Sequence, residues 1–346
     1  MKLLFVTQKL HGQDAFGVLW ANAFAARGYD VTVLCLEWQP EKMKEVLPDV
    51  PLNFQVLSMG KESTKVKVKH ILNFWKHILA HKSDRVFVHM APVWGLLGAP
   101  VWIIRRTPAY LWYTHYKMQA GLWLMALYGK RLFCATEQSM PMYPSTSSGQ
   151  VHAKKVVTGH GIDRTFWPRR ENHTTEPHKL LMVHRLARSK RAELCIKALT
   201  HLPTFFTLDI YGQEVEPDYA AELKALVAEL GLAERVRFLG SAPVKDLPEI
   251  YTHHQLILNM ASETIDKTML EAMTCGCYPV TTGRNAQAIG IPGAPHDDTP
   301  EAIAAFVQEA LSHAPMTAEE MDRVVEQKHS LRHIVEVMDS YMHSGT

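Results

Sequence analysis

LILNMASETIDKTMLEAMTCGCYPVTT, residues 256–282, is the segment in which the architecture of this chain is easiest to recognise. The apolar run 256–260 predicts a buried strand, a short helix follows and ends at Gly276, and 278–282 predicts the next strand. A strand, a helix and a second strand in this order are typical of an open parallel α/β sheet. Such sheets bind ligands beyond the carboxyl ends of their strands, so the loop and helix after residue 260 form a candidate site.

Two carboxylates lie in this candidate site. Glu263 falls on the loop and Glu271 within the helix, with seven residues between them. Carboxylates placed in this way could bind two sets of sugar hydroxyls, and the N-terminus of the helix suits an anion such as phosphate. We expect Asp266 to cap the helix with its side chain; a phosphate contact from Lys267 is the alternative.

The length and composition describe an ordinary globular protein with room for two domains. The chain has 346 residues, of which 47% are hydrophobic and 21% charged, and its net charge is +2. The start, 1–7, predicts a strand rather than a signal peptide, and the apolar stretch 93–104 is shorter than the roughly 20 residues of a membrane span. Five scattered cysteines favour a reducing, cytoplasmic compartment and argue against a structural zinc.

Charge is divided unevenly along the chain. Residues 1–150 carry 17 Lys/Arg and 9 Asp/Glu, a net charge of +8, whereas 151–346 have a net charge of −6. The basic half therefore suggests an anionic partner. Within it, 65–82 mixes lysines with Ile, Leu, Phe and Trp, and could form an amphipathic helix on the anionic inner face of the plasma membrane. The alternative is a helix that packs on its sheet and presents a solvated basic face.

Strand-like and helix-like segments alternate through both halves, which predicts parallel sheets with helices on both faces. We expect a first domain at 1–162, a linker at 163–177, a second domain at 178–325, and a C-terminal helix at 326–346 that could pack back on the first domain. Thr317 and Glu320 have the spacing of a capping box. The predicted strands are 2–7, 30–36, 53–58, 85–90, 110–114, 132–136, 154–158, 179–183, 206–211, 236–239, 256–260 and 278–282.

A basic turn follows the first predicted strand of the second domain. Arg185 and Lys190 are separated by four residues and could converge on a diphosphate at the start of the next helix, 191–200. A solvated basic turn is the alternative. The segment is not a Walker loop, because it lacks the Gly-x4-Gly-Lys-Ser/Thr pattern.

The first domain offers weaker candidates. His115 lies at the carboxyl end of a predicted strand, and the loop at 8–17 follows the first strand. In the segment 160–163, Gly161 permits a tight turn and Asp163 can bond its own backbone. This segment is predicted to be either a hinge turn or a direct contact to ligand.

Taken together, these motifs resemble glycosyltransferase family 4. The set comprises Arg185-x4-Lys190, Glu263-x7-Glu271, the segment 236–240 and the segment 160–163. Enzymes of this family are retaining and nucleotide-sugar-dependent, and they have the GT-B fold, in which two Rossmann-like doubly wound domains face a central cleft. The resemblance covers nearly the whole chain and is strongest from 154 to 282.

The resemblance implies a role for each matched position. Arg185 and Lys190 would neutralise the donor diphosphate in place of a metal ion, with Glu271 on the ribose, Glu263 on the donor sugar and His115 beside the transferred sugar. It implies no cofactor, only a UDP- or GDP-sugar as co-substrate, a front-face reaction, and a glycan or lipid-linked glycan as acceptor. Nucleic acid is not an expected partner. Further donor contacts would come from Ser241, Val244, Thr264, Lys267, Met269 and Leu270, and an acceptor or phosphate loop from Asp14, Phe16, Gly17 and His160.

Three positions depart from the family pattern. The usual Gly-Phe-Gly after the first glutamate is Thr264-Ile265-Asp266, the double glycine of the first loop is replaced at 14–17, and His184 stands where most members have glycine. Two alternatives stay open, the first of them suggested by the departure at 264–267. One is a catalytically degenerate GT-B protein that binds nucleotide sugars or carbohydrates, and the other is a different GT-B enzyme, such as a nucleotide-sugar epimerase.

Overall fold

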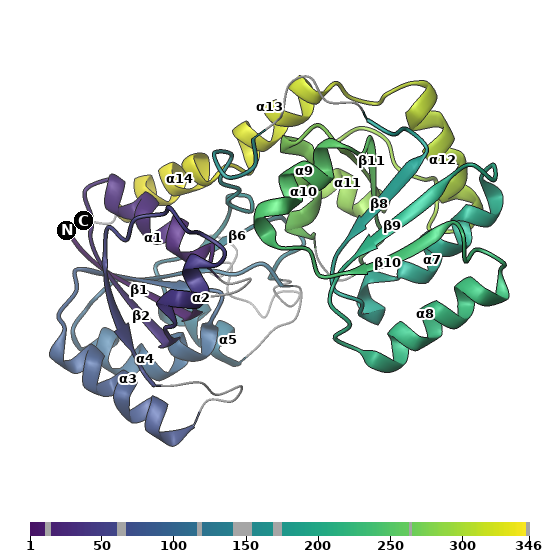
Figure 1. Cartoon of the computed structure of the whole chain (residues 1–346). Helices are drawn as coiled ribbons and strands as arrows, with labels where there is room; N and C mark the ends of the chain where they lie inside the picture. The colour runs from purple at the N-terminus through teal and green to yellow at the C-terminus, as the bar shows by residue number, and fades with distance from the viewer. Residues whose placement is uncertain are drawn as a thin grey trace. The chain divides into compact units, whose positions relative to one another are not determined.

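The computed structural model in Figure 1 describes residues 1–10, 15–60, 67–115, 120–140, 154–168, 175–262 and 265–343. The chain forms two compact units. Unit 1 contains the chain up to Gly161 together with the C-terminal helix α14 (Leu331–His343), and unit 2 runs from Ile162 to His329. Each unit is built on its own parallel sheet.

Unit 1 contains a seven-stranded sheet in the order β3-β2-β1-β4-β5-β6-β7, in which every pair is parallel. The inner strands are almost continuous apolar runs, as expected for strands that are covered on both faces. The strands are β1 (Lys2–Lys9), β2 (Asp30–Glu37), β3 (Gln55–Ser58), β4 (Arg85–His89), β5 (Ala109–Trp112), β6 (Arg131–Cys134) and β7 (Lys155–Val157).

Helices cover both faces of this sheet (Figure 1). On one face, α3 (Val68–Ala80), α4 (Pro92–Ile104) and α5 (Ala120–Tyr128) form a core with Leu4, Val6 and their neighbours. On the other face, Phe5 meets Phe24 of α1 (Gly17–Ala26), and α14 packs against α1. Successive residues of a strand point to opposite faces, so β1 contributes to both cores.

Unit 2 contains a five-stranded parallel sheet in the order β10-β9-β8-β11-β12. The first strand, β8, lies in the middle, and the chain continues to β9 on one side and later returns to β11 on the other. The order therefore reverses between β8 and β11, which makes this point the topological switch of the sheet. The strands are β8 (Lys179–Val183), β9 (Thr207–Tyr211), β10 (Val236–Gly240), β11 (Leu256–Asn259) and β12 (Tyr278–Thr281).

The helices of unit 2 lie on both faces of its sheet, as Figure 1 shows. Helices α7 and α12 pack together, and α10 packs against α9 and α13. The two parallel α/β domains predicted from the sequence are therefore confirmed. The helices are α7 (Ala192–Ala198), α8 (Pro217–Glu229), α9 (Leu247–Thr252), α10 (Lys267–Thr274), α11 (Gly283–Ile289), α12 (Pro300–Ser312) and α13 (Ala318–Lys328).

Two short helices were not predicted, and one predicted cap is confirmed. Helix α2 (Pro40–Lys44) has only five residues, too few to show a helical period. Helix α11 begins at Gly283, a poor helix former, but Thr282 caps it by accepting a hydrogen bond from the Asn285 amide. The capping box of α13 forms as expected between Thr317 and Glu320.

The turn at His160 and Gly161 follows β7 and lies against α1 and α14. Gly161 has φ +77°, and a Cβ atom at this position would lie 2.5 Å from Trp20 Cζ2 and 2.7 Å from Ile334 Cδ1. The glycine is therefore required both by its backbone conformation and by the close approach of α1 and α14.

Replacing Gly161 with Ala should lower stability by about 2 kcal/mol or more, because overpacking adds to the cost of a left-handed backbone. Gly231→Ala is the matched control: Gly231 has φ +66°, and a Cβ atom added there would meet nothing within 4 Å, so only the backbone cost of about 1 kcal/mol applies. Denaturant unfolding of both variants measures the difference. Equal losses would show that the packing of Trp20 and Ile334 is not tight.

Candidate functional site

The loops that follow β8 and β11 are bonded to each other at the switch point. The Ser262 amide donates to the Ser189 carbonyl at 3.1 Å, and Arg191 Nε donates to the Met260 carbonyl at 2.7 Å. Arg191 has φ +52°, a left-handed backbone conformation, at the position just before α7. The two loops singled out by the sequence therefore form one supported edge of the sheet.

Lys190 and Asp266 form an ion pair at this edge. Their side chains are only 9% and 14% exposed. Asn259, at the end of β11, is fully buried and donates from Nδ2 to Asp266 Oδ2 at 3.0 Å. The ammonium group of Lys190 is thus held by a carboxylate that is itself held by the strand. Charges taken out of water need this kind of partner, because an unpaired buried charge is strongly destabilising.

The predicted role of the Asp266 side chain was wrong. Asp266 does occupy the N-cap position of α10, but its carboxylate makes no hydrogen bond to the first turn of that helix. It pairs instead with Lys190 and Asn259. A buried ammonium group is a stronger partner for a carboxylate than a backbone amide, so the tertiary contact prevails over the local cap.

The cations after β8 differ in their partners. Arg188 donates from its two terminal guanidinium nitrogens to the two carboxylate oxygens of Glu222, at 2.8 and 2.5 Å. Arg191 pairs with Asp298 at 2.8 Å. Lys190 is paired with Asp266. Arg185 is exposed and forms no ion pair with any residue that the structure describes. Its guanidinium group is therefore the one in this loop best placed to receive an external anion.

His184 occupies the position before Arg185 as a buried, neutral group. It is 7% exposed, and burial lowers the pKa of its imidazole. Gly212 lies against its backbone: a Cβ atom there would be 1.8 Å from the His184 carbonyl oxygen. The bulk of the imidazole is accommodated inside unit 2, and the backbone of the loop packs closely on the end of β9.

Glu271 is a buried carboxylate on α10, one helical turn after Lys267. It is 7% exposed, and Tyr251 Oη donates to its Oε2 at 3.4 Å. Burial raises the pKa of Glu271 to about 7, an effect that the nearby Lys267 opposes. A carboxyl group with such a pKa changes its charge near neutral pH, so its capacity to accept hydrogen bonds from a ligand depends on pH.

The remaining donor-site candidates of unit 2 fall into two groups. The side chains of Met269 and Leu270 are fully buried in the core. Ser241 is exposed and Val244 half-buried, and both follow β10, as Arg185 follows β8, at the carboxyl edge of the parallel sheet. Glu263 and Thr264 lie outside the described residues.

The candidates of unit 1 lie at the carboxyl edge of its own sheet. His115 is exposed and stands edge-on to Tyr113 at 5.4 Å. Phe16 precedes α1, where its carbonyl accepts from the Leu19 amide at 3.1 Å, and Gly17 is buried. His160 is only 2% exposed and lies edge-on to Trp112 at 6.3 Å, so its imidazole is part of the core. Asp14 lies outside the described residues.

Sequence reasoning missed Asn259 and Tyr251. Asn259 is the one polar residue of the apolar strand 256–259, a signal that could have been used. Tyr251 gave no such signal, because it reaches Glu271 only through the packing of α9 on α10.

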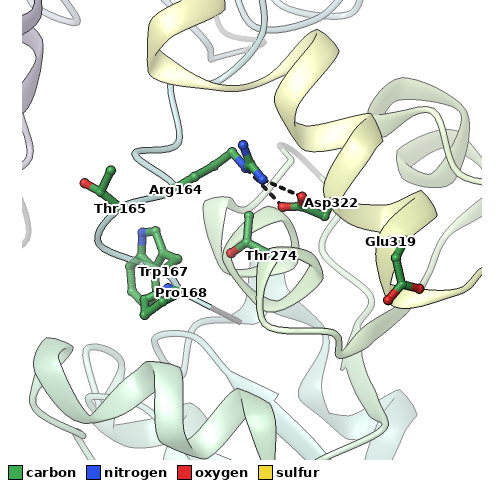
Figure 2. Close-up of a pocket in the computed structure, with 7 residues that line it drawn as sticks. All are labelled: Arg164, Thr165, Trp167, Pro168, Thr274, Glu319 and Asp322. Carbon is green, nitrogen blue, oxygen red and sulfur yellow. Dashed lines mark hydrogen bonds and ion pairs between the residues drawn. The ribbon is translucent and has the colours of Figure 1, made fainter. Parts of the chain in front are cut away.

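A separate pocket of about 390 Å³ lies at the opposite end of α10 (Figure 2). Its walls include Thr274, the last residue of α10, and Trp167. Arg164 crosses it to bond Asp322 of α13, and also bonds Glu326 at 2.7 Å. The described part of the predicted linker is thus anchored within unit 2. There, Asp163 Oδ1 accepts from the Thr165 amide at 3.0 Å, which confirms the predicted local turn.

Comparison with known proteins identifies the family that this edge resembles. Residues 163–288 match the family model described as Glycosyl transferases group 1. HepE from Anabaena, solved with UDP-glucose, is similar in structure, with a TM-score of 0.78 and 18% identity over 99% of this chain and 100% of that one. Sucrose-phosphate synthase from Thermosynechococcus elongatus has a TM-score of 0.77 and 14% identity, with 99% of each chain covered.

The lipopolysaccharide outer core galactosyltransferase WaaB is also similar, with a TM-score of 0.70 and 16% identity over the full length of both chains. A search of curated proteins finds no match. At these identities the structural likeness establishes the fold alone. The chain has the two-domain GT-B fold of these glycosyltransferases, and the segment that carries its candidate donor site, 163–288, matches the Glycosyl transferases group 1 model.

Proposed function

We propose that this protein transfers a sugar, with retention of configuration, from a nucleoside diphosphate sugar to a hydroxyl group of a glycan or lipid-linked glycan. The observation that carries the proposal is the Lys190–Asp266 ion pair, within the segment that matches the glycosyl transferase model. It joins the loop after β8, in which Arg185 lies, to the start of α10, the helix that contains Glu271. The UDP-glucose in HepE supports a UDP-sugar as the first donor to test.

Each group would act where charge or hydroxyls must be recognised. As the bond between the anomeric carbon and the phosphate oxygen breaks, negative charge grows on the diphosphate. Arg185, Lys190 and the N-terminus of α10 would stabilise it without a metal ion. In a front-face reaction the acceptor oxygen attacks from the same side, and its proton passes to the departing phosphate oxygen. Glu271 would accept hydrogen bonds from the ribose.

Unit 1 would supply the acceptor side of the reaction. We place His115 beside the transferred sugar and the loop containing Asp14, Phe16 and Gly17 near the phosphates or the acceptor. Glu263 would bind the hydroxyls of the donor sugar. The buried position of His160 favours a supporting role for its turn rather than direct contact with ligand.

A second candidate function is binding of a nucleotide sugar without turnover. The observation that favours it is the Asp266 carboxylate, which occupies the ammonium group of Lys190 where a diphosphate would be expected to bind. Under this alternative the donor would still bind through Arg185 and Glu271, but the leaving group would gain less stabilisation.

A panel of UDP-, GDP- and ADP-sugars separates the two functions. Thermal shift reports binding of each donor, and release of free nucleotide in the presence of glycan acceptors reports turnover. We expect a shift with one nucleotide series and release from the same series. A shift without release would favour the binding protein, and the absence of any shift would contradict both.

Arg185→Ala should reduce kcat/KM about tenfold to a hundredfold, because one charge-assisted hydrogen bond to the diphosphate is lost. Arg185 is exposed, so the melting temperature should not change. Arg188→Ala is the matched control, since Arg188 lies in the same loop but is paired with Glu222. Steady-state kinetics measure both variants, and equal effects would remove Arg185 from the site.

A further inference from the structure

Helix α3 has a second apolar stripe that faces solvent. Phe74 and Ile78 are buried against the sheet, as expected. Val68, Leu72 and Leu79 are nevertheless 72%, 60% and 55% exposed, and with Trp75 they follow the spacing i, i+4, i+7, i+11 of one helical face. A surface helix of a globular protein normally presents polar residues on this side. The stripe therefore requires an explanation other than packing within unit 1.

Helices α4 and α5 extend this apolar surface. Neither contains a charged residue, although both lie on the outside of unit 1. Ile104 of α4 and Leu127 of α5 are 82% and 70% exposed. Trp75 Nε1 donates to the Leu97 carbonyl at 2.9 Å, which joins α3 to α4, and α4 packs along α5. We call the solvent side of these three helices the α3–α5 face.

The α3–α5 face collects most of the exposed apolar side chains. Of the sixteen large apolar side chains that are exposed among the described residues, ten lie on these three helices. Apolar side chains scattered singly over a surface are normal, whereas a contiguous group marks a site of interaction.

The charges around the α3–α5 face have one sign. From residue 67 to residue 131 the sequence contains ten Lys/Arg and a single acidic residue, Asp84. Lys69 and Lys76 lie on α3 beside the stripe, and Arg105 and Arg106 follow α4. Arg105 donates to the carbonyls of Ile78 and Leu79, at 2.6 and 2.8 Å, so its cation is fixed at the C-terminal end of α3.

This charge selects among the possible partners. Two copies of the chain joined through this face would bring their basic residues together, which is unfavourable. An apolar surface with lysine and arginine around it is complementary to a layer that has hydrocarbon below and negative charge above. Tryptophan, here at positions 75 and 123, is enriched at that boundary.

None of the helices in the described part of the chain is both long enough and apolar enough to cross a bilayer. We propose that the α3–α5 face docks on an anionic phospholipid surface, with Leu72, Trp75, Trp123 and Leu127 entering the interface while Lys69 and Lys76 bind headgroups. This binding site lies on unit 1 and is independent of the donor site proposed for unit 2.

Flotation with vesicles tests the proposal on the full chain. Vesicles of equal parts phosphatidylglycerol and phosphatidylcholine are compared with vesicles of phosphatidylcholine alone at low salt. The wild type should float with the anionic vesicles and bind the neutral ones at least tenfold more weakly. Leu72→Ser/Leu127→Ser and Lys69→Glu/Lys76→Glu should each weaken binding about tenfold or more, since apolar burial and each cation contribute separately.

Phe205→Ser is the matched control, because Phe205 is 59% exposed on unit 2, outside the face. It should float like the wild type. Transfer of sugar to a soluble acceptor, measured by the free nucleotide released, should be unchanged in Leu72→Ser/Leu127→Ser, which separates this proposal from the proposed function.

Two results would overturn the proposal. One is a wild type that does not float with anionic vesicles, or that floats no better than the two double variants. The other is a wild type that sediments as a dimer and does not bind vesicles, together with a Leu72→Ser/Leu127→Ser variant that sediments as a monomer. That outcome would show that a second copy covers the face.

Discussion

Replacing Glu271 with Gln should make the protein more stable above pH 7 and lower its affinity for the donor. The carboxyl group is buried, and its pKa is raised from the usual 4.5 to about 7. Ionising it in the folded state costs about 3 kcal/mol, at 1.36 kcal/mol for each pKa unit. Gln keeps the shape and can still accept the hydrogen bond from Tyr251, but it carries no charge to bury.

The sign of the pH dependence follows from proton binding. Between pH 4.5 and about 7 the folded wild type binds more protons at Glu271 than the unfolded chain does, so its stability falls as pH rises through this window. Glu271→Gln escapes this loss. Its advantage in free energy of unfolding should be small at pH 5, grow through the window and be complete at pH 8.

Donor binding should change in the opposite sense. Loss of the carboxylate should raise the dissociation constant for the nucleotide about tenfold or more at pH 8. For the wild type this constant should rise as pH falls below 7, whereas for Glu271→Gln it should be flat. Chemical denaturation and calorimetric titration at pH 5 and 8 measure both effects. Glu229→Gln, on the exposed side of α8, is the control that should change neither.

A stability gain that is equal at pH 5 and pH 8 would mean that Glu271 is not the titrating group. Unchanged nucleotide affinity would instead show that the carboxylate does not touch the donor, while leaving the stability argument intact.

Replacing Lys190 with Ala should destabilise the protein by about 3–5 kcal/mol, because the Asp266 carboxylate, only 14% exposed, is left without its cation. The double variant Lys190→Met/Asp266→Asn should recover most of the stability that Lys190→Ala loses. It removes both charges, and an amide at position 266 can still bond Asn259. Turnover should be lower by about 100-fold to 1,000-fold in both variants, because neither can stabilise the charge of the leaving diphosphate.

Thermal unfolding and nucleotide release measure the two consequences separately. Arg188→Ala/Glu222→Ala removes the exposed ion pair of the same loop and should change stability little, because solvent screens exposed charges. Recovery of turnover together with stability in Lys190→Met/Asp266→Asn would show that Lys190 serves the fold alone.

Much of the fold followed from hydrophobic pattern. The segment 256–282 predicted a strand, a helix and a strand, and the structure contains β11, α10 and β12 within one residue of the predicted strand limits. Errors fell on short elements such as α2 and α11, where a cap or a proline determines the structure and too few residues remain to show a period.

The candidate site was only partly accessible to the same reasoning. Arg185, Lys190 and Glu271 were chosen as candidates from their spacing and from the motifs that they resemble, and their roles stay predictions. The sequence did not predict that the Asp266 carboxylate pairs with Lys190 instead of capping α10. Lys190 and Asp266 lie 76 positions apart in the chain, and local propensity describes only what a residue can do with its neighbours.

By itself the sequence determined the alternation of strands and helices, the two parallel sheets and the edge at which the basic and acidic residues gather. These features depend on periodicity and on topology that short connections enforce. The tertiary structure alone decided which cation is paired, which carboxylate is buried with a pKa near 7, and which apolar helix face remains uncovered. Those properties are set by desolvation and by neighbours distant in the chain, and a one-dimensional pattern contains no record of either.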